Sequence, residues 1–305
     1  MLDPNAMPPV KLSKGAIFFR RLFSFVVLWT VVIGSLFSGH KALSDYVFLL
    51  IILLLAVSGL MEFYGMARKL NYACYSGLGV VGGVLMILFT FYCISGEFGA
   101  AVTPSRMNDR ETIFIIIFVL GLCVRQFMSR SVSTGIIAIS TTLFGMMYVP
   151  WLLNFIQKIN FFGQAGVEGP YYVLYFVLVT KFSDCGAYAV GSLIGRHKMI
   201  PRISPGKTWE GFGGAIVVST AASVIFARVA GHHLAGMTLL HSIILGIILS
   251  IAAVVGDLIE SLFKREAGLK DSGSMFPGIG GILDLLDSLL FNAPIMYLYL
   301  RHVLT

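Results

Sequence analysis

Residues 239–300 read LLHSIILGIILSIAAVVGDLIESLFKREAGLKDSGSMFPGIGGILDLLDSLLFNAPIMYLYL. Two apolar runs, at about 239–262 and 281–300, enclose a segment, 261–287, that carries three basic and four acidic residues. Each run has about the 20 residues that an α-helix needs to cross a bilayer. Charges beside such runs are expensive to bury without partners, so the stretch predicts a functional site within a membrane protein.

The rest of the chain has the same character. Of its 305 residues, 57% are hydrophobic and 12% are charged, and its mean hydropathy is +0.87. These values exclude an ordinary soluble domain and predict an all-α, polytopic integral membrane protein of about nine transmembrane helices. The nine apolar runs lie at about 16–38, 44–64, 74–95, 112–128, 133–157, 170–194, 211–230, 239–262 and 281–300.

The basic residues predict the orientation of these spans. With the N-terminus in the cytosol, fifteen of the 22 Lys and Arg residues fall on the cytosolic side, six fall outside, and Lys181 lies within a span. This bias follows the positive-inside rule. The net charge of +7 is then explained by short loops beside lipid headgroups, and we expect the bilayer, not nucleic acid, as the partner. The first run lacks a small-residue cleavage site, so we expect a retained anchor.

The acidic residues divide the chain into two regions. Seven of the fifteen Asp and Glu residues lie in residues 1–169, mostly in predicted loops, whereas the other eight form tight groups after residue 183. We therefore expect residues 1–169 to be a scaffold of about five helices, and residues 170–305 to be a catalytic region of about four.

The acidic groups of the second region are expected at one depth, on the cytosolic side. Asp184 lies in the cytosolic half of its span, Asp257 at the end of the next but one, and Asp284 and Asp287 one helical turn apart at the start of the last. Such carboxylates repel each other unless cations lie between them, and hard oxygen ligands suit Mg²⁺. Structural ion pairs with nearby lysines and arginines, or a proton or sodium pathway, are the alternatives.

Basic and hydroxyl side chains near these carboxylates suit a phosphorylated substrate. Lys207, Lys264, Arg265 and Lys270 can neutralise phosphates, and Ser and Thr residues are interleaved with them. The glycine-rich turn at 278–281 can also present backbone N–H groups to phosphate at the start of a helix.

Three motifs resemble those of the phosphatidate cytidylyltransferases, also called CDP-diacylglycerol synthases. GDLIESLFKREAGLKDSGSMFPGIGGILDLLDS at 256–288 resembles the signature of that family, and SDCGAY at 183–188 and RISPGKTWEG at 202–211 resemble its upstream motifs. The resemblance implies a nucleotidyltransferase of phospholipid biosynthesis that acts on CTP and phosphatidate. It implies Mg²⁺ held by Asp257, Asp284 and Asp287, and phosphates contacted by Lys207, Lys264 and Arg265.

The expected site residues follow from the residues and the resemblance together. The catalytic candidates are Asp257, Lys264, Arg265, Asp284 and Asp287, and the substrate-binding candidates are Asp184, Ser204, Lys207, Thr208, Ser261, Lys270 and Asp271. A second, monovalent cation such as K⁺ and a homodimer are further expectations. We place the protein in a bacterial inner or plasma membrane with its site facing the cytosol.

The chain departs from the family pattern at four positions. Ile279 stands where the family often has His, Leu285 where it has a basic residue, Gly206 where it has Lys, and Cys185 where it has Thr. A mechanism that needs a histidine base at Ile279 is therefore excluded. A CTP-dependent polyprenol or lipid-alcohol kinase and a cation-coupled transporter are the competing functions; a kinase would release CDP, and a transporter would place carboxylates near the bilayer midplane.

Overall fold

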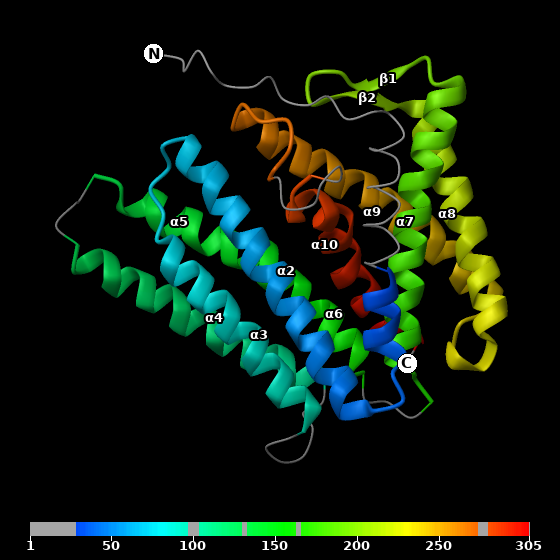
Figure 1. The fold of residues 1–305 in the computed structure, drawn as a ribbon, viewed down its shortest axis with the longest axis horizontal. Coiled ribbons are helices and arrows are strands. Elements are labelled where there is room, and N and C mark those ends of the chain that lie inside the picture. The colour runs from blue at the N-terminus through cyan, green and yellow to red at the C-terminus, as the bar shows by residue number, and fades with distance from the viewer. Residues whose placement is uncertain (1–28, 97–103, 130–132, 163–165, 274–279, 305) are drawn as a thin grey trace, which may run out of the picture.

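The computed structural model describes residues 29–96, 104–129, 133–162, 166–273 and 280–304, and these residues are mainly helical (Figure 1). Helices predominate because a segment that crosses a bilayer must satisfy its backbone hydrogen bonds internally. This confirms the all-α prediction. The elements are α2 (Lys41–Lys69), α3 (Ser76–Ser95), α4 (Pro104–Phe127), α5 (Gly135–Met146), η1 (Met147–Trp151), α6 (Leu152–Asn160), α7 (Gly169–Ile194), β1 (Lys198–Ile200), β2 (Ser204–Thr208), α8 (Trp209–Ala230), η2 (Gly231–His233), α9 (Leu239–Glu266), α10 (Ile282–Tyr299) and η3 (Leu300–Leu304).

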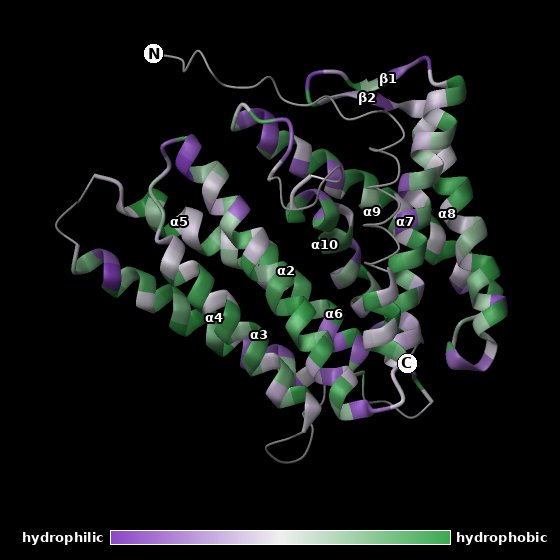
Figure 2. Ribbon diagram, viewed as in Figure 1, coloured by the Kyte–Doolittle hydropathy of each residue, from purple (hydrophilic) through white to green (hydrophobic). Residues whose placement is uncertain are grey.

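Seven helical segments of the described residues are long and apolar enough to cross a membrane. Apolar residues colour their middle parts in Figure 2, and hydrophilic residues gather towards the helix ends and the β1–β2 hairpin. The predicted run at 112–128 lies in α4, which begins earlier and is not among the seven. The run at 16–38 lies mostly outside the described residues, of which 29–37 are helical. The count of nine spans stays a prediction.

Helix α10 connects the two halves of the bundle. In the second half, α7 packs along α8, α8 along α9, and α9 along α10, while in the first half α2 packs against α3. Helix α10 contacts both α6 and α2, so it lies between the two groups (Figure 1). Its buried side chains Leu283, Leu286 and Leu290 belong to the common apolar core. Residues at the start of α10 are thus placed by both halves of the chain.

The glycine-rich run at 77–83 allows close packing in the first half. A Cβ atom at Gly79 would collide with the ring of Tyr64, and one at Gly83 would lie 2.9 Å from Cγ of Pro150. Pro150 lies in η1, a π-helical segment between α5 and α6. Because Pro cannot donate a backbone hydrogen bond, it accounts for the break in the regular α-helix.

A buried ion pair joins α4 to α6. Lys158 was expected just beyond the fifth span, in an exterior loop, but it lies in α6 and is only 3% exposed. Its ammonium pairs with the buried carboxylate of Glu111, which also accepts hydrogen bonds from Thr90 and Asn154, each 3.2 Å long. The apolar surroundings make this pairing necessary, because an isolated charge there would be strongly destabilising.

Candidate active site

A polar pocket of about 510 Å³ is formed by α7, the β1–β2 hairpin, α8, α9 and α10. Asp184 of α7, Asp257 of α9, and Asp284 and Asp287 of α10 all line it, so the structure brings together the four carboxylates that the sequence grouped by depth. The full lining is Asp184, Ala187, Tyr188, Gly191, Ser192, Met199, Ser204, Gly206, Lys207, Thr208, Gly211, Phe212, Val254, Asp257, Asp284 and Asp287.

The hairpin brings a lysine over α9. Strand β1 pairs with β2 in antiparallel register, with Lys198 opposite Thr208. Thr208 caps α8, because its Oγ1 accepts a hydrogen bond of 3.1 Å from the backbone N–H of Gly211. Beside it, Nζ of Lys207 lies 2.8 Å from Oδ2 of Asp257 and donates to the carbonyl of Val254 at 3.2 Å. The segment between the predicted spans 170–194 and 211–230 therefore forms an ordered hairpin that covers the pocket.

Three of the carboxylates repel one another. Asp287 is only 8% exposed, and its charge interacts unfavourably with those of Asp184 and Asp257. Nζ of Lys181 lies 3.4 Å from Asp184 and also donates to the carbonyl of Leu285 at 3.3 Å. Lys181 and Lys207 are thus two positive charges beside three negative ones, and the excess negative charge favours binding of a further cation.

Asp284 has a different environment from these three. Its Oδ1 lies 2.5 Å from Nζ of Lys264, which also pairs with the fully buried Glu260. Its Oδ2 accepts hydrogen bonds from the backbone N–H of Ser272 at 3.0 Å, from the hydroxyl of Ser272 at 2.9 Å and from the N–H of Gly281 at 2.8 Å. Asp284 therefore holds the start of α10 against the end of α9.

The donor atoms of the pocket are of the type that binds magnesium, although they do not form a complete coordination shell. Among the described residues, no group of three or more His, Cys, Asp and Glu side chains is arranged to hold a metal ion. The pocket does offer hard carboxylate oxygens at Asp184, Asp257 and Asp287, whose charges repel one another when all three are ionised. These are the donors that Mg²⁺ prefers, so the residues fit this ion.

Five predicted residues do not line the pocket, and one of them is Lys264, which lies between Glu260 and Asp284. Ser261 is buried behind it and donates to Oδ1 of Asp257 at 3.3 Å. Arg265 is exposed, and its guanidinium donates to the carbonyls of Ile203 at 3.2 Å and Leu269 at 3.1 Å, which braces the hairpin against the end of α9. Lys270 and Asp271 are exposed in the turn that follows. Ile279 and Gly278 lie outside the described residues.

Two residues from the first half of the chain reach the site, and the sequence analysis missed both. The carboxylate of Glu62 in α2 accepts hydrogen bonds from the backbone N–H groups of Ile282 and Leu283, each 2.9 Å long. Tyr148 of η1 is 6% exposed, and its hydroxyl, near the charges of Glu260 and Asp287, has no hydrogen-bond partner among the described residues. Glu62 could have been recognised from the sequence, because it is an acidic residue inside the predicted span 44–64.

Glu62 and Asp284 also change the interpretation of the glycine-rich turn. The turn at 278–281 was expected to present backbone N–H groups to phosphate at the start of this helix, where the first amides are those of Gly281, Ile282 and Leu283. Instead, all three donate to these carboxylates. The first amides of α10 therefore serve to hold the helix in place.

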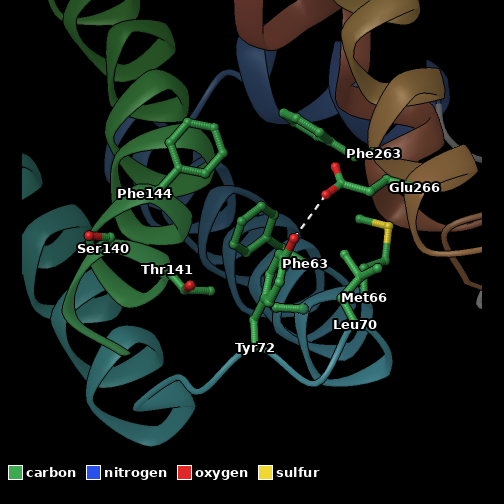
Figure 3. A pocket seen from close by; sticks show the side chains of 10 residues that line it. Phe63, Met66, Leu70, Tyr72, Ser140, Thr141, Phe144, Phe263 and Glu266 are labelled. Carbon is green, nitrogen blue, oxygen red and sulfur yellow. Dashed lines mark hydrogen bonds between the residues drawn. The ribbon is translucent and has the colours of Figure 1, made fainter. Parts of the chain in front are cut away.

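A second, apolar pocket lies on the other side of α9. Figure 3 shows Phe63 and Met66 of α2, Phe144 of α5 and Phe263 of α9 around it. Its volume is about 280 Å³, and the hydroxyl of Tyr72 donates to Glu266 at 3.1 Å across it (Figure 3). Glu266 is the only carboxylate that lines it. The polar pocket, with four carboxylates, is the candidate active site.

Comparison with known proteins finds a matching family model and several similar sequences. Residues 19–303 match the sequence model of a family described as the "Cytidylyltransferase family". The chain is 31% identical over 253 residues to a protein of Staphylococcus saprophyticus named phosphatidate cytidylyltransferase, with 83% of this chain and 91% of the relative aligned. A protein of the same name from Bacillus subtilis is 31% identical over 270 residues, 86% of this chain and 95% of the relative. One from Mycobacterium leprae is 37% identical over 158 residues, about half of each chain.

Proposed function

The chain belongs to the cytidylyltransferase family, and we infer that it is a phosphatidate cytidylyltransferase, a membrane nucleotidyltransferase of phospholipid biosynthesis. It converts CTP and phosphatidate to CDP-diacylglycerol and pyrophosphate. The observation that carries this inference is the pocket in which Asp184, Asp257 and Asp287 lie beside Lys181 and Lys207 at the ends of apolar helices. A kinase reading has no comparable support from the relatives.

The reaction needs little covalent help from the protein. An oxygen of the phosphatidate phosphate forms a bond to the α-phosphorus of CTP while the bond from that phosphorus to the pyrophosphate oxygen breaks, and the electron pair leaves with pyrophosphate. Both substrates are anions, so the protein must hold them together and neutralise their charge. No histidine base is required, since an ionised phosphate is already a nucleophile.

Lys207 is the cation best placed to bind a substrate phosphate. It lines the pocket, its side chain is 20% exposed, and the carboxylate of Asp257 that it contacts is 36% exposed. Lys264 is more deeply buried between Glu260 and Asp284. We therefore assign Lys207 to substrate binding and Lys264 to ordering the carboxylates of α10, while Ser204 also lines the pocket and Thr208 caps α8 beside it.

Asp257 and Asp287, with Asp184 and Asp284 beside them, would hold Mg²⁺. When bound, Mg²⁺ neutralises phosphate charge and favours departure of pyrophosphate. The protein's own contribution is a set of carboxylates on α7, α9 and α10 together with Lys207, which contacts Asp257. A second, monovalent cation and a homodimer stay predictions.

The site is proposed to face the cytosol of a bacterium. The distribution of Lys and Arg supports this orientation, as does the need for CTP, a soluble nucleotide. The acyl chains of phosphatidate then stay in the bilayer while its phosphate reaches the pocket at the helix ends.

The test is pyrophosphate release from CTP by purified protein in detergent. We expect release that requires both phosphatidate and Mg²⁺ and that stops when EDTA is added. Release of CDP in place of pyrophosphate would identify a lipid kinase. Lack of any Mg²⁺-dependent CTP turnover with phosphatidate would overturn the proposal.

A further inference from the structure

We propose that Glu62, from the half of the chain predicted to be only a scaffold, is a positioning residue of this active site. Its carboxylate fixes the N-terminus of α10, and α10 carries Asp284 and Asp287. The inference rests on the proposed function for its catalytic consequence. Its structural part, that Glu62 holds the start of α10, can be tested without any turnover.

Three hydrogen bonds attach Glu62 to the site. Oε1 accepts from the N–H of Ile282 and Oε2 from the N–H of Leu283, each at 2.9 Å. Oε2 also lies 2.9 Å from the hydroxyl of Ser272. A carboxylate at the first amides of a helix is favoured both by these bonds and by the helix dipole.

Glycines lie close to this carboxylate at Gly273 and at the start of α10. A Cβ atom at Gly281 or at Gly273 would collide with an oxygen of Glu62. Gly280 has a φ of +109°, which other residues rarely adopt. Because glycine is required wherever the backbone comes this close, the turn and Glu62 form one fitted unit.

Ser272 connects Glu62 to the catalytic carboxylate. Its hydroxyl lies 2.9 Å from both Oε2 of Glu62 and Oδ2 of Asp284. Asp284 in turn contacts Lys264, and Lys264 contacts Glu260. The orientation of Asp284 therefore depends on a helix that contributes nothing else to the polar pocket, and Asp287 follows one turn later on the same α10.

The position of Glu62 in α2 argues against an incidental contact. Its neighbour Met61 is 62% exposed on an apolar helix, and Phe63 is 8% exposed in the core. A carboxylate in such a span is costly unless its oxygens are bonded. The cost of burying the Glu62 carboxylate is offset by donors beside the active site, namely the N–H groups of Ile282 and Leu283 and the hydroxyl of Ser272. Glu62 therefore acts on the start of α10.

The experiment compares Glu62→Gln with Glu266→Gln in the full-length protein. Glu266 is a matched control, because it also has a carboxylate at this end of the bundle that accepts a hydrogen bond from another segment, Tyr72. In Glu62→Gln, an NH2 group replaces one of the two acceptor oxygens, so a donor faces a backbone N–H and that hydrogen bond is lost. We expect faster hydrogen exchange in peptides covering 281–290, and a kcat lower by about tenfold to a hundredfold. The KM values for CTP and phosphatidate should change by no more than about threefold.

The outcomes separate the two claims. Unchanged exchange at 281–290 would overturn the anchoring role, and faster exchange with unchanged kcat would reduce Glu62 to a structural residue; either result overturns the proposal. If the wild-type protein shows no turnover, the proposed function fails while the exchange comparison still tests the anchor. If Glu62→Gln does not fold, Ser272→Ala, which removes only the shared hydroxyl, should lower kcat with KM retained, and wild-type kcat in that variant would overturn the proposal.

Discussion

Single charged residues carry most of the information in this chain. Because a charge in an apolar protein needs a reason, the positions of Asp184, Asp257, Asp284 and Asp287 could be predicted to converge, and they line one pocket. The same rule applied to Glu62, but its half of the chain was interpreted as scaffold. The roles of Asp284 and Arg265 could not be predicted, since their hydrogen bonds depend on loop geometry that has no sequence pattern.

The substitution Asp287→Asn tests whether the Asp287 carboxylate is needed for activity or for a structural ion pair. Because the change removes one of three mutually repelling charges, the variant without Mg²⁺ should be at least as thermally stable as the wild type. Its activity should fall by at least a hundredfold, and added Mg²⁺ should raise its Tm less than that of the wild type. Thermal unfolding with EDTA or Mg²⁺, together with pyrophosphate release, measures this. The exposed Asp109→Asn is the control, and a large loss of Tm in EDTA for Asp287→Asn would instead indicate a structural pair.

Lys207→Met tests the cation of the hairpin. Lys207 lines the pocket, whereas Lys198 on the paired strand does not. We expect Lys207→Met to lower kcat/KM for CTP by more than about tenfold, since a charge-assisted phosphate contact is lost. Lys198→Met should stay within about twofold of the wild type. Equal effects of the two substitutions on steady-state kinetics would contradict the assignment.

At the scale of elements, helices could be predicted and irregular segments could not. The run at 44–64 became α2 (Lys41–Lys69), and the run at 281–300 became α10 (Ile282–Tyr299). Long apolar runs identify helices of this kind without ambiguity. The hairpin at 198–208 lies between two predicted spans, and its short strands show no alternation of apolar and polar residues from which they could be predicted. The π-helical turn at Pro150 packs against Gly83 on another helix, and this contact has no sequence pattern.

The α4–α6 ion pair gives a prediction at this scale. Glu111→Gln leaves the buried ammonium of Lys158 without its counter-charge and should lower the free energy of unfolding by about 3–5 kcal/mol. Adding Lys158→Met to that variant should restore much of the loss, because no buried charge then remains. The half-exposed Glu168, which pairs with His233, provides the control Glu168→Gln, with a change below about 1 kcal/mol. Equilibrium unfolding in detergent measures all three variants, and an additive double variant would contradict the pairing.

At the scale of the whole molecule, the two predicted regions meet at the site. The four carboxylates that line the polar pocket all come from residues 170–305. However, α10 packs against α2 and α6 as well as α7 and α9, and Glu62 crosses that division. Contacts between distant segments have no periodic signal in a single sequence, so the contribution of the first half could be found only in the folded structure.

We infer that this pocket transfers the cytidylyl group of CTP to phosphatidate. The destination of labelled phosphorus atoms of CTP tests this transfer directly. Purified protein in vesicles containing phosphatidate would receive CTP labelled at either the α- or the γ-phosphorus, with Mg²⁺, and the lipid would be extracted. We predict that the α-label enters the lipid, that the γ-label leaves in pyrophosphate, and that Asp257→Asn abolishes both. Label from the γ-phosphorus in the lipid, or full α-label transfer by Asp257→Asn, would contradict it.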